Sequence, residues 1–175
     1  PSSSIIVTGC YAQLKPEELA AVKEVDMIFG AKEKFNLLDH LDSIELNHKT
    51  KLFHSEINSV SHFEPSFSSN DRTRSYLKVQ DGCDYNCTFC TIPLARGASR
   101  SSTVSKTLIS AKQAISSGAR EIVLTGVNIG DFGVNSHEKF IDLLVALNDL
   151  NDLDRIRISS IEPNLLSNEI IEFCA

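Results

Sequence analysis

Short apolar segments of strand character alternate with longer segments in which apolar residues recur at helical spacing. From residue 75 onward the order is strand, loop, helix, strand, helix, strand, helix. Helices between such strands are typical of βαβ units, whose strands are parallel. The repeated units predict an α/β fold, either a (β/α) barrel or a doubly wound sheet. The helix expected at 103–118 turns four residues toward the core and has a glycine past its end: Val104, Leu108, Ala111, Ile115 and Gly118.

The first part of the chain follows the same alternation. Strands are expected at residues 4–9 and 26–30, and helices at 15–25 and 32–46. The expected inward residues are Leu19, Val22 and Val25 in the first helix and Phe35, Leu38, Leu41 and Ile44 in the second. Residues 49–74 are polar and rich in serine, which indicates a linker. We therefore expect one domain at 1–48 and another at 75–175.

The ends and the overall composition set further expectations. The chain begins on a strand and ends within an apolar helix, so a fragment of a longer protein is expected. No apolar run approaches the roughly 20 residues of a membrane-spanning helix, and the first residues do not resemble a signal peptide, which favours a cytoplasmic location. The net charge of -6 argues against a grip on nucleic acid through phosphate neutralisation alone. Any affinity for nucleic acid would need another surface.

Three of the five cysteines are crowded into one predicted loop. Cys83, Cys87 and Cys90 have the spacing C-x3-C-x2-C and follow the strand expected after the linker. An odd total with three crowded members fits a disulfide framework poorly and favours a metal or redox site. Loops at the ends of parallel strands share one sheet edge, so the segments "TGVNIGDFG" and "SSIEPN" are expected beside the cysteines.

Two metals suit this loop. Structural zinc takes four protein ligands and would need a fourth from elsewhere, such as Cys10 or His62. An iron-sulfur cube held by three thiolates leaves one iron open to a substrate or cofactor. The chain is then either an enzyme with an iron-sulfur cluster or a non-catalytic zinc-binding module.

The cysteine loop resembles that of the radical S-adenosylmethionine superfamily, with Phe89 at the aromatic position of C-x3-C-x-aromatic-C. The resemblance implies that S-adenosylmethionine chelates the open iron and is cleaved to a 5'-deoxyadenosyl radical, which abstracts a hydrogen from the substrate. It also implies that Phe89 belongs to the cofactor site and that the next two strand-end loops line that site. The residues expected there are Thr125, Gly126 and Asn128 in one loop and Ser159, Ser160 and Glu162 in the other.

Four segments together resemble the methylthiotransferases, radical enzymes that insert a sulfur and methylate it. They are "VTGCYAQLKPEEL", "LKVQDGCDYNCTFCTIPLARGASRS", "VLTGVNIGDFG" and "RISSIEPNLL". The resemblance implies part of an N-terminal α/β methylthiotransferase domain, followed by the first half of a radical S-adenosylmethionine (β/α) partial TIM barrel. It implies two 4Fe-4S clusters in the full-length protein, with Cys10 in a GC-A-Q motif at the auxiliary one. The resemblance further implies that two more auxiliary ligands, the later barrel strands and an RNA-binding domain lie outside this sequence.

Within that family the segments most resemble the branch that converts N6-threonylcarbamoyladenosine beside the anticodon into its 2-methylthio form. This implies a tRNA substrate and a reductase as electron donor, and leaves the oligomeric state open. The alternative branch acts on an aspartate of a ribosomal protein. Arg96 and Arg100 are expected either to meet an anionic group or to be solvated. Cys174 is expected to be a structural residue beside Ile170 and Ile171.

Overall fold

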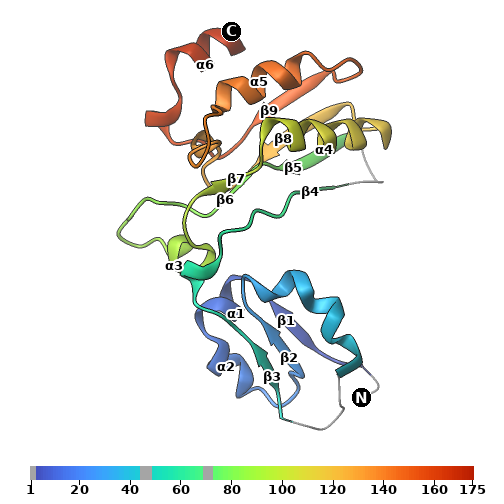
Figure 1. The fold of residues 1–175 in the computed structure, drawn as a ribbon, viewed down its shortest axis with the longest axis vertical. Coiled ribbons are helices and arrows are strands. Elements are labelled where there is room, and N and C mark those ends of the chain that lie inside the picture. The colour runs from blue at the N-terminus through green and yellow to red at the C-terminus, as the bar shows by residue number, and fades with distance from the viewer. Residues whose placement is uncertain (1–2, 44–48, 69–72) are drawn as a thin grey trace. The chain divides into compact units, whose positions relative to one another are not determined.

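A computed structural model describes residues 3–43, 49–68 and 73–175, and its mixed α/β character agrees with the sequence prediction (Figure 1). The chain forms two compact units. The first unit comprises Pro1–Ser61 with Asp84–Ala98, and the second comprises His62–Cys83 with Ser99–Ala175. The predicted linker at 49–74 and the helix predicted at 32–46 both run partly into residues outside the described ranges.

The first unit is built on a three-stranded parallel sheet of order β1-β2-β3. The strands are β1 (Ile6–Thr8), β2 (Met27–Phe29) and β3 (Lys51–Phe53). All residues of the central strand β2 are buried, as expected of a parallel strand covered on both faces. Two short helices, α1 (Cys10–Leu14) and α2 (Pro16–Ala20), connect β1 to β2. Pro16 begins α2, where its missing N–H needs no partner.

The helix expected at 32–46 is instead the 3₁₀ segment η1 (Glu33–Ser43). Its apolar residues do not form the expected buried face, because Phe35, Leu38 and Leu41 are exposed and Ile44 lies outside the described residues. The segment contacts the sheet through His40, whose ring centroid lies 4.2 Å from that of Phe53. The helical spacing of these apolar residues thus predicted that they share one face of the segment, but it could not show whether another element packs on that face.

Part of the segment expected to be a linker belongs to the first sheet. Lys51–Phe53 forms β3, and the Phe53 ring stacks on Phe29 with centroids 4.8 Å apart. The segment Asp84–Ala98 also belongs to the first unit, because α3 (Ile92–Arg96) packs against α1 and against the short helix η2 (Ile57–Ser59). The domain limits at residues 48 and 74 stay a prediction.

The second unit is built on a four-stranded sheet of order β4-β5-β8-β9. Strands β5 (Arg74–Lys78), β8 (Glu121–Thr125) and β9 (Arg155–Ile158) are parallel, and β4 (Ser66–Phe67) is antiparallel to β5. A small antiparallel ribbon of β6 (Gln80–Asp81) and β7 (Arg100–Ser101) follows β5. The remaining elements are α4 (Val104–Ser116), η3 (Ile129–Asp131), α5 (Phe140–Asn148), η4 (Pro163–Leu165) and α6 (Asn168–Cys174).

Helices α4 and α5 cover one face of this sheet (Figure 1). The predicted inward face of α4 is confirmed, since Ala111 is fully buried and Val104, Leu108 and Ile115 pack on the same core. Thr103 caps the helix by accepting a hydrogen bond from the Lys106 amide. Gly118 beyond its end has φ 97°, a conformation that favours glycine. The buried core comprises Leu77, Val79, Ala111, Ile122, Leu124, Ile129, Phe132, Phe140, Leu143, Leu144, Leu147 and Ile170.

The opposite face of the sheet carries charged side chains. Successive residues of a strand point to opposite faces, so Arg74, Glu121 and Arg155, which are neighbours in the strand register, share this face. Glu121 contacts both arginines, at 3.0 Å and 3.5 Å. One face of the second sheet is therefore apolar and helix-covered, and the other carries an ion-paired cluster of charged side chains.

Among the described residues we find no helix with the length and apolar character needed to cross a membrane.

Candidate cluster and cofactor site

The cysteine triplet lies on the loop between β6 and α3. Cys83 follows the end of β6 and is half-buried, whereas Cys87 and Cys90 are exposed. The Cys90 amide donates a hydrogen bond of 3.0 Å to the Cys87 carbonyl, so the last two cysteines share a turn. Pro93 in the first turn of α3 ends the loop. The predicted position of the triplet just after a strand is what the structure shows.

The chemistry of this donor set fits an iron-sulfur cluster. Three thiols on one short loop are soft ligands, and the exposure of Cys87 and Cys90 leaves them open to an incoming cluster. The side chains are not gathered in advance: across residues 3–43, 49–68 and 73–175, no three His, Cys, Asp or Glu side chains form a group that could hold a metal. Phe89, expected in the cofactor site, is 96% exposed.

The loops after β6 and β8 meet at Gln80, whose side chain is fully buried. Its Nε2 donates to the carbonyls of Asp81 (3.1 Å) and Gly82 (2.8 Å) and to the Ser99 hydroxyl (2.9 Å). Its Oε1 accepts hydrogen bonds of 2.9 Å from the amides of Val127 and Asn128. One side chain thus ties the approach to Cys83 to the loop after β8.

Thr125 and Gly126 lie at the end of β8, beside this tie. The Thr125 carbonyl accepts a hydrogen bond from the Val79 amide at 2.9 Å. A Cβ atom added to Gly126 would lie 2.9 Å from both the carbonyl oxygen and Oε1 of Gln80. Glycine is therefore required here because Gln80 approaches the backbone of residue 126 too closely for a side chain, whether or not the residue also contacts a cofactor.

The loops after β8 and β9 are joined through Asn128, which is buried. Its Nδ2 donates to Asp131 at 3.2 Å and its Oδ1 accepts from the Glu162 amide at 3.2 Å. The Ile129 amide donates to the Ser160 carbonyl at 3.0 Å, and the Ser159 hydroxyl donates to the Leu124 carbonyl at 2.6 Å. The structure thus brings together the two loops predicted to line the cofactor site, and assigns the side chains of Asn128 and Ser159 to holding them.

A buried ion pair supports the base of the cysteine loop. Asp81 Oδ2 lies 2.8 Å from Lys78 Nζ and 3.3 Å from an Arg100 guanidinium nitrogen. Asp81 Oδ1 also accepts from the Gly82 amide at 3.0 Å. Arg100 is buried and donates in addition to the His62 carbonyl at 3.0 Å. Arg100 is therefore a buried partner of Asp81, which corrects the expectation that it is solvated; contact with an anionic ligand stays a prediction.

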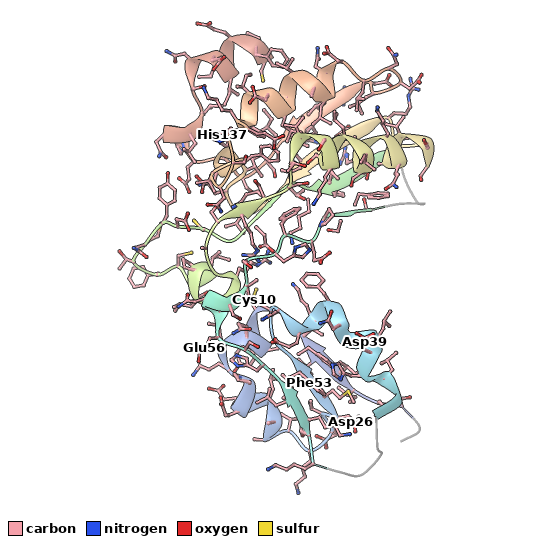
Figure 2. All side chains as sticks on the ribbon, in the orientation of Figure 1. Cys10, Asp26, Asp39, Phe53, Glu56 and His137 are labelled. Atoms are coloured by element: carbon pink, nitrogen blue, oxygen red, sulfur yellow. The ribbon has the colours of Figure 1, made fainter. Side chains whose placement is uncertain are left out.

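Cys10 begins α1, directly after β1 and Gly9, and is half-buried (Figure 2). Gly9 has φ 113°, so the turn that presents Cys10 favours glycine. The neighbouring Tyr11 donates a hydrogen bond of 2.5 Å to Glu18. This hydrogen bond, together with the charge of Glu18, raises the pKa of Tyr11 above its ordinary value.

The buried side chain of Gln13 ties α1 to the ends of β2 and β3. Its Oε1 accepts from the Ala31 amide at 2.8 Å, and its Nε2 donates to the Ser55 carbonyl at 3.1 Å. Its Nε2 also lies 2.9 Å from His54 Nε2. The helix that begins at Cys10 is thereby fixed to the carboxyl edge of the first sheet.

The sequence prediction was incomplete at several positions around the site. Gln13, Gln80, Asp81 and Ser99 were not singled out, although a polar glutamine directly before the "DGC" of the cysteine loop was a usable signal. Cys174, expected to be a structural residue on an apolar face, is exposed at the end of α6. Its neighbour Ile170 is the residue of that helix that reaches the core.

A search against protein-family models gave no match. Curated relatives nevertheless match almost the entire chain. Proteins named threonylcarbamoyladenosine tRNA methylthiotransferase MtaB are 38% identical in Bacillus subtilis and 39% identical in Thermotoga maritima, each over 98% of this chain. A protein of Rickettsia rickettsii named tRNA-2-methylthio-N(6)-dimethylallyladenosine synthase is 32% identical over 98% of the chain. The chain spans 39–40% of the length of these three relatives. Over that span, the sequence is similar to methylthiotransferases of the MtaB-like family.

Proposed function

We propose that this chain is part of a tRNA methylthiotransferase that adds sulfur and a methyl group at C2 of N6-threonylcarbamoyladenosine, next to the anticodon. The observation that carries the proposal is the three-cysteine loop at the carboxyl end of a parallel sheet, with the loops after β8 and β9 tied together at the same edge. The relatives named for this reaction match the chain almost from end to end.

Cys83, Cys87 and Cys90 hold the radical 4Fe-4S cluster in this proposal, and Cys10 holds part of an auxiliary 4Fe-4S cluster. When bound, the radical cluster and S-adenosylmethionine together supply the 5'-deoxyadenosyl radical that removes a hydrogen from the substrate. The chain's own residues bind the cofactor and orient it. Phe89, Thr125 and Gly126 contact S-adenosylmethionine, as do residues of the loops held by Asn128, namely Ser159, Ser160 and Glu162.

The proposal includes the surroundings of the enzyme. Residues 1–48 are part of the N-terminal methylthiotransferase domain, and residues 75–175 are the beginning of a radical (β/α) partial barrel. The protein works in the cytoplasm, takes its electron from a reductase, and recognises tRNA largely through parts outside this chain. The net charge of -6 supports the last point, because tRNA affinity normally rests on many phosphate contacts.

Metal analysis separates the enzyme from a zinc-binding module. The full-length protein that carries this sequence is purified without oxygen, reconstituted with iron and sulfide, and analysed. We expect about eight iron and eight sulfide per chain, since two 4Fe-4S cubes are proposed. The variant lacking the thiols of Cys83, Cys87 and Cys90 should keep about half of that. A single tightly bound zinc, without iron, would refute the proposal.

The substrate is tested by the nucleosides of tRNA from cells that lack the gene. Loss of 2-methylthio-N6-threonylcarbamoyladenosine, with accumulation of its precursor, supports the proposal. The Rickettsia rickettsii relative favours a second candidate, in which the base carries an N6-dimethylallyl group. Selective loss of 2-methylthio-N6-dimethylallyladenosine would transfer the function to that candidate. Unchanged tRNA with an unmodified ribosomal-protein aspartate would transfer it to the ribosomal branch.

A further inference from the structure

The buried side-chain amide of Gln80 joins two loops of the second unit. It is fully buried, and its amide group makes three donor contacts and two acceptor contacts. We propose that Gln80 is a positioning residue, which holds Cys83 in register with the loop that contacts S-adenosylmethionine. This inference rests on the proposed function.

The donor side of the amide fixes the chain immediately before Cys83. Nε2 holds the carbonyls of Asp81 and Gly82, the two residues that lead into the cysteine. Gly82 has φ 73°, a left-handed conformation, and its amide is held by the Asp81 carboxylate. The direction in which the chain reaches Cys83 is therefore supported by hydrogen bonds to Gln80 and Asp81.

The acceptor side fixes the opposite loop. Oε1 receives the adjacent amides of Val127 and Asn128, which would otherwise be donors without a partner at the end of β8. Gly126 allows this approach, because any Cβ there would collide with Gln80. A displacement of Gln80 would thus move the residues on both sides of the proposed cofactor site.

Only an amide side chain can make this set of contacts. Glutamate has the same shape and can still accept from Val127 and Asn128, but when ionised it cannot donate to Asp81, Gly82 or Ser99. Methionine has a similar length and offers neither function. The two substitutions therefore remove the donor side alone or both sides of the tie.

The test uses Gln80→Met and Gln80→Glu in the full-length protein reconstituted with iron and sulfide. We expect each variant to retain iron but to raise the KM for S-adenosylmethionine by about tenfold or more, with a smaller change in kcat, because a lost buried hydrogen bond of this kind corresponds to roughly a tenfold change in an equilibrium constant. The electron paramagnetic resonance signal of the reduced cluster should need correspondingly more S-adenosylmethionine to shift. The control is Gln113→Met, at an exposed position of α4, which should match the wild type.

Hydrogen exchange of the metal-free protein provides a readout that needs no cluster. Amides of residues 81–83 and 126–128 should exchange faster in Gln80→Met, and those of 81–83 in Gln80→Glu. Faster exchange with unchanged KM and unchanged resonance signal would overturn the positioning role and leave a merely structural one. Unchanged exchange would overturn the tie itself. A wild-type protein that takes up no iron would refute the proposed function, and the exchange comparison would still decide the tie. If Gln80→Met fails to fold, Gln80→Glu alone decides the outcome.

Discussion

The surroundings of Cys10 and Cys83 have the same local design in two different units. Each cysteine follows the carboxyl end of a strand, and a buried glutamine stands three residues from it in sequence, Gln13 after Cys10 and Gln80 before Cys83. In both cases the amide joins loops at neighbouring strand ends, at Ala31 and Ser55 in the first unit and at Gly82 and Asn128 in the second.

The two units differ in the size of the sheet and of the buried apolar core that support this arrangement. The first sheet has strands of three residues, with a buried apolar cluster of Ala12, Val25 and Ile28 and the buried side chains of Met27 and Phe29 beside them in β2. The second has strands of up to five residues over a cluster of twelve buried apolar residues. Buried apolar area is the main favourable term in folding, so the polar tie should carry a larger share of local stability in the first unit. In the second unit the hydrogen bonds of Gln80 should contribute a smaller share of local stability, and their main role should be to position Cys83 and the loop after β8.

The largest effect is expected at the cysteine triplet, whose loss should stop the cleavage of S-adenosylmethionine. Cys87→Ala leaves the radical cluster with two of its three thiolate ligands, so we expect complete loss of 5'-deoxyadenosine formation by the full-length enzyme. Cleavage is measured by chromatography with reductant in excess. Cys174→Ala, at the exposed end of α6, is the control and should cleave normally. Normal cleavage by Cys87→Ala would show that the loop does not hold the radical cluster.

Cys10→Ala should remove only part of the activity. In the proposal Cys10 belongs to the auxiliary cluster and the triplet to the radical cluster, although Cys10 lies in the same unit as Cys87 and Cys90. We expect S-adenosylmethionine cleavage to persist while sulfur transfer to tRNA stops, as measured by the methylthio nucleoside. Loss of both activities, with loss of the iron of both clusters, would place Cys10 with the triplet.

A cavity in the second core should destabilise that unit strongly. Leu124 is fully buried in β8, and truncation of such a residue to alanine typically costs about 2–5 kcal/mol. Hydrogen exchange of the Leu124→Ala variant under native conditions should show the loss of stability as faster exchange of the amides in β8 and α4. If β2 of the first unit lost the same protection, the two units would unfold as one and the comparison between them would fail.

The polar tie of the first unit should matter less than a core cavity but remain measurable. Gln13→Met leaves the Ala31 amide and the Ser55 carbonyl without their partner, which typically costs about 1–3 kcal/mol. Exchange at α1 and residues 30–31 should rise accordingly. The same substitution at Gln80 should lower the stability of β8 by a smaller fraction than Gln13→Met lowers that of β2. The reverse ranking would contradict the proposed division between stability and positioning.

The smallest effect is expected at the surface. Arg120 donates two hydrogen bonds to Asp154, at 2.9 Å and 2.8 Å, and these bonds raise the pKa of Arg120. Both side chains are largely exposed, where water screens the pair. Asp154→Asn should therefore leave the thermal midpoint unchanged within error. A clear drop in the midpoint would mean that the start of β9 depends on this pair.

Features of the fold that depend on local periodicity could be predicted from the sequence. The spacing of apolar residues in α4 predicted its buried face, because side chains return to the same face of a helix about every 3.6 residues, whichever element the helix packs against. The same spacing was misleading in η1, where Phe35 and Leu38 share a face that is exposed. Strand β3 was missed because its three residues, "KLF", are too short to show alternation.

Of the candidate site, the sequence predicted the loops but not the contacts that join them. The spacing of the cysteines and the position of each loop after a strand were visible in the order of residues. The bonds of Gln80 to Val127 and Asn128 link positions 47 and 48 residues apart, and such pairings leave no periodic signal. Arg100 shows the same limit, since its partner Asp81 lies 19 residues away.

The contact between Gly126 and Gln80 has a consequence for how the two positions can change during evolution. A side chain at position 126 would meet both the carboxamide oxygen and the backbone carbonyl of residue 80. Replacing Gln80 by a smaller residue would relieve the first collision but leave the second. A lineage that loses the glutamine should therefore still retain the glycine, whereas a lineage that loses the glycine must also have moved the backbone at residue 80.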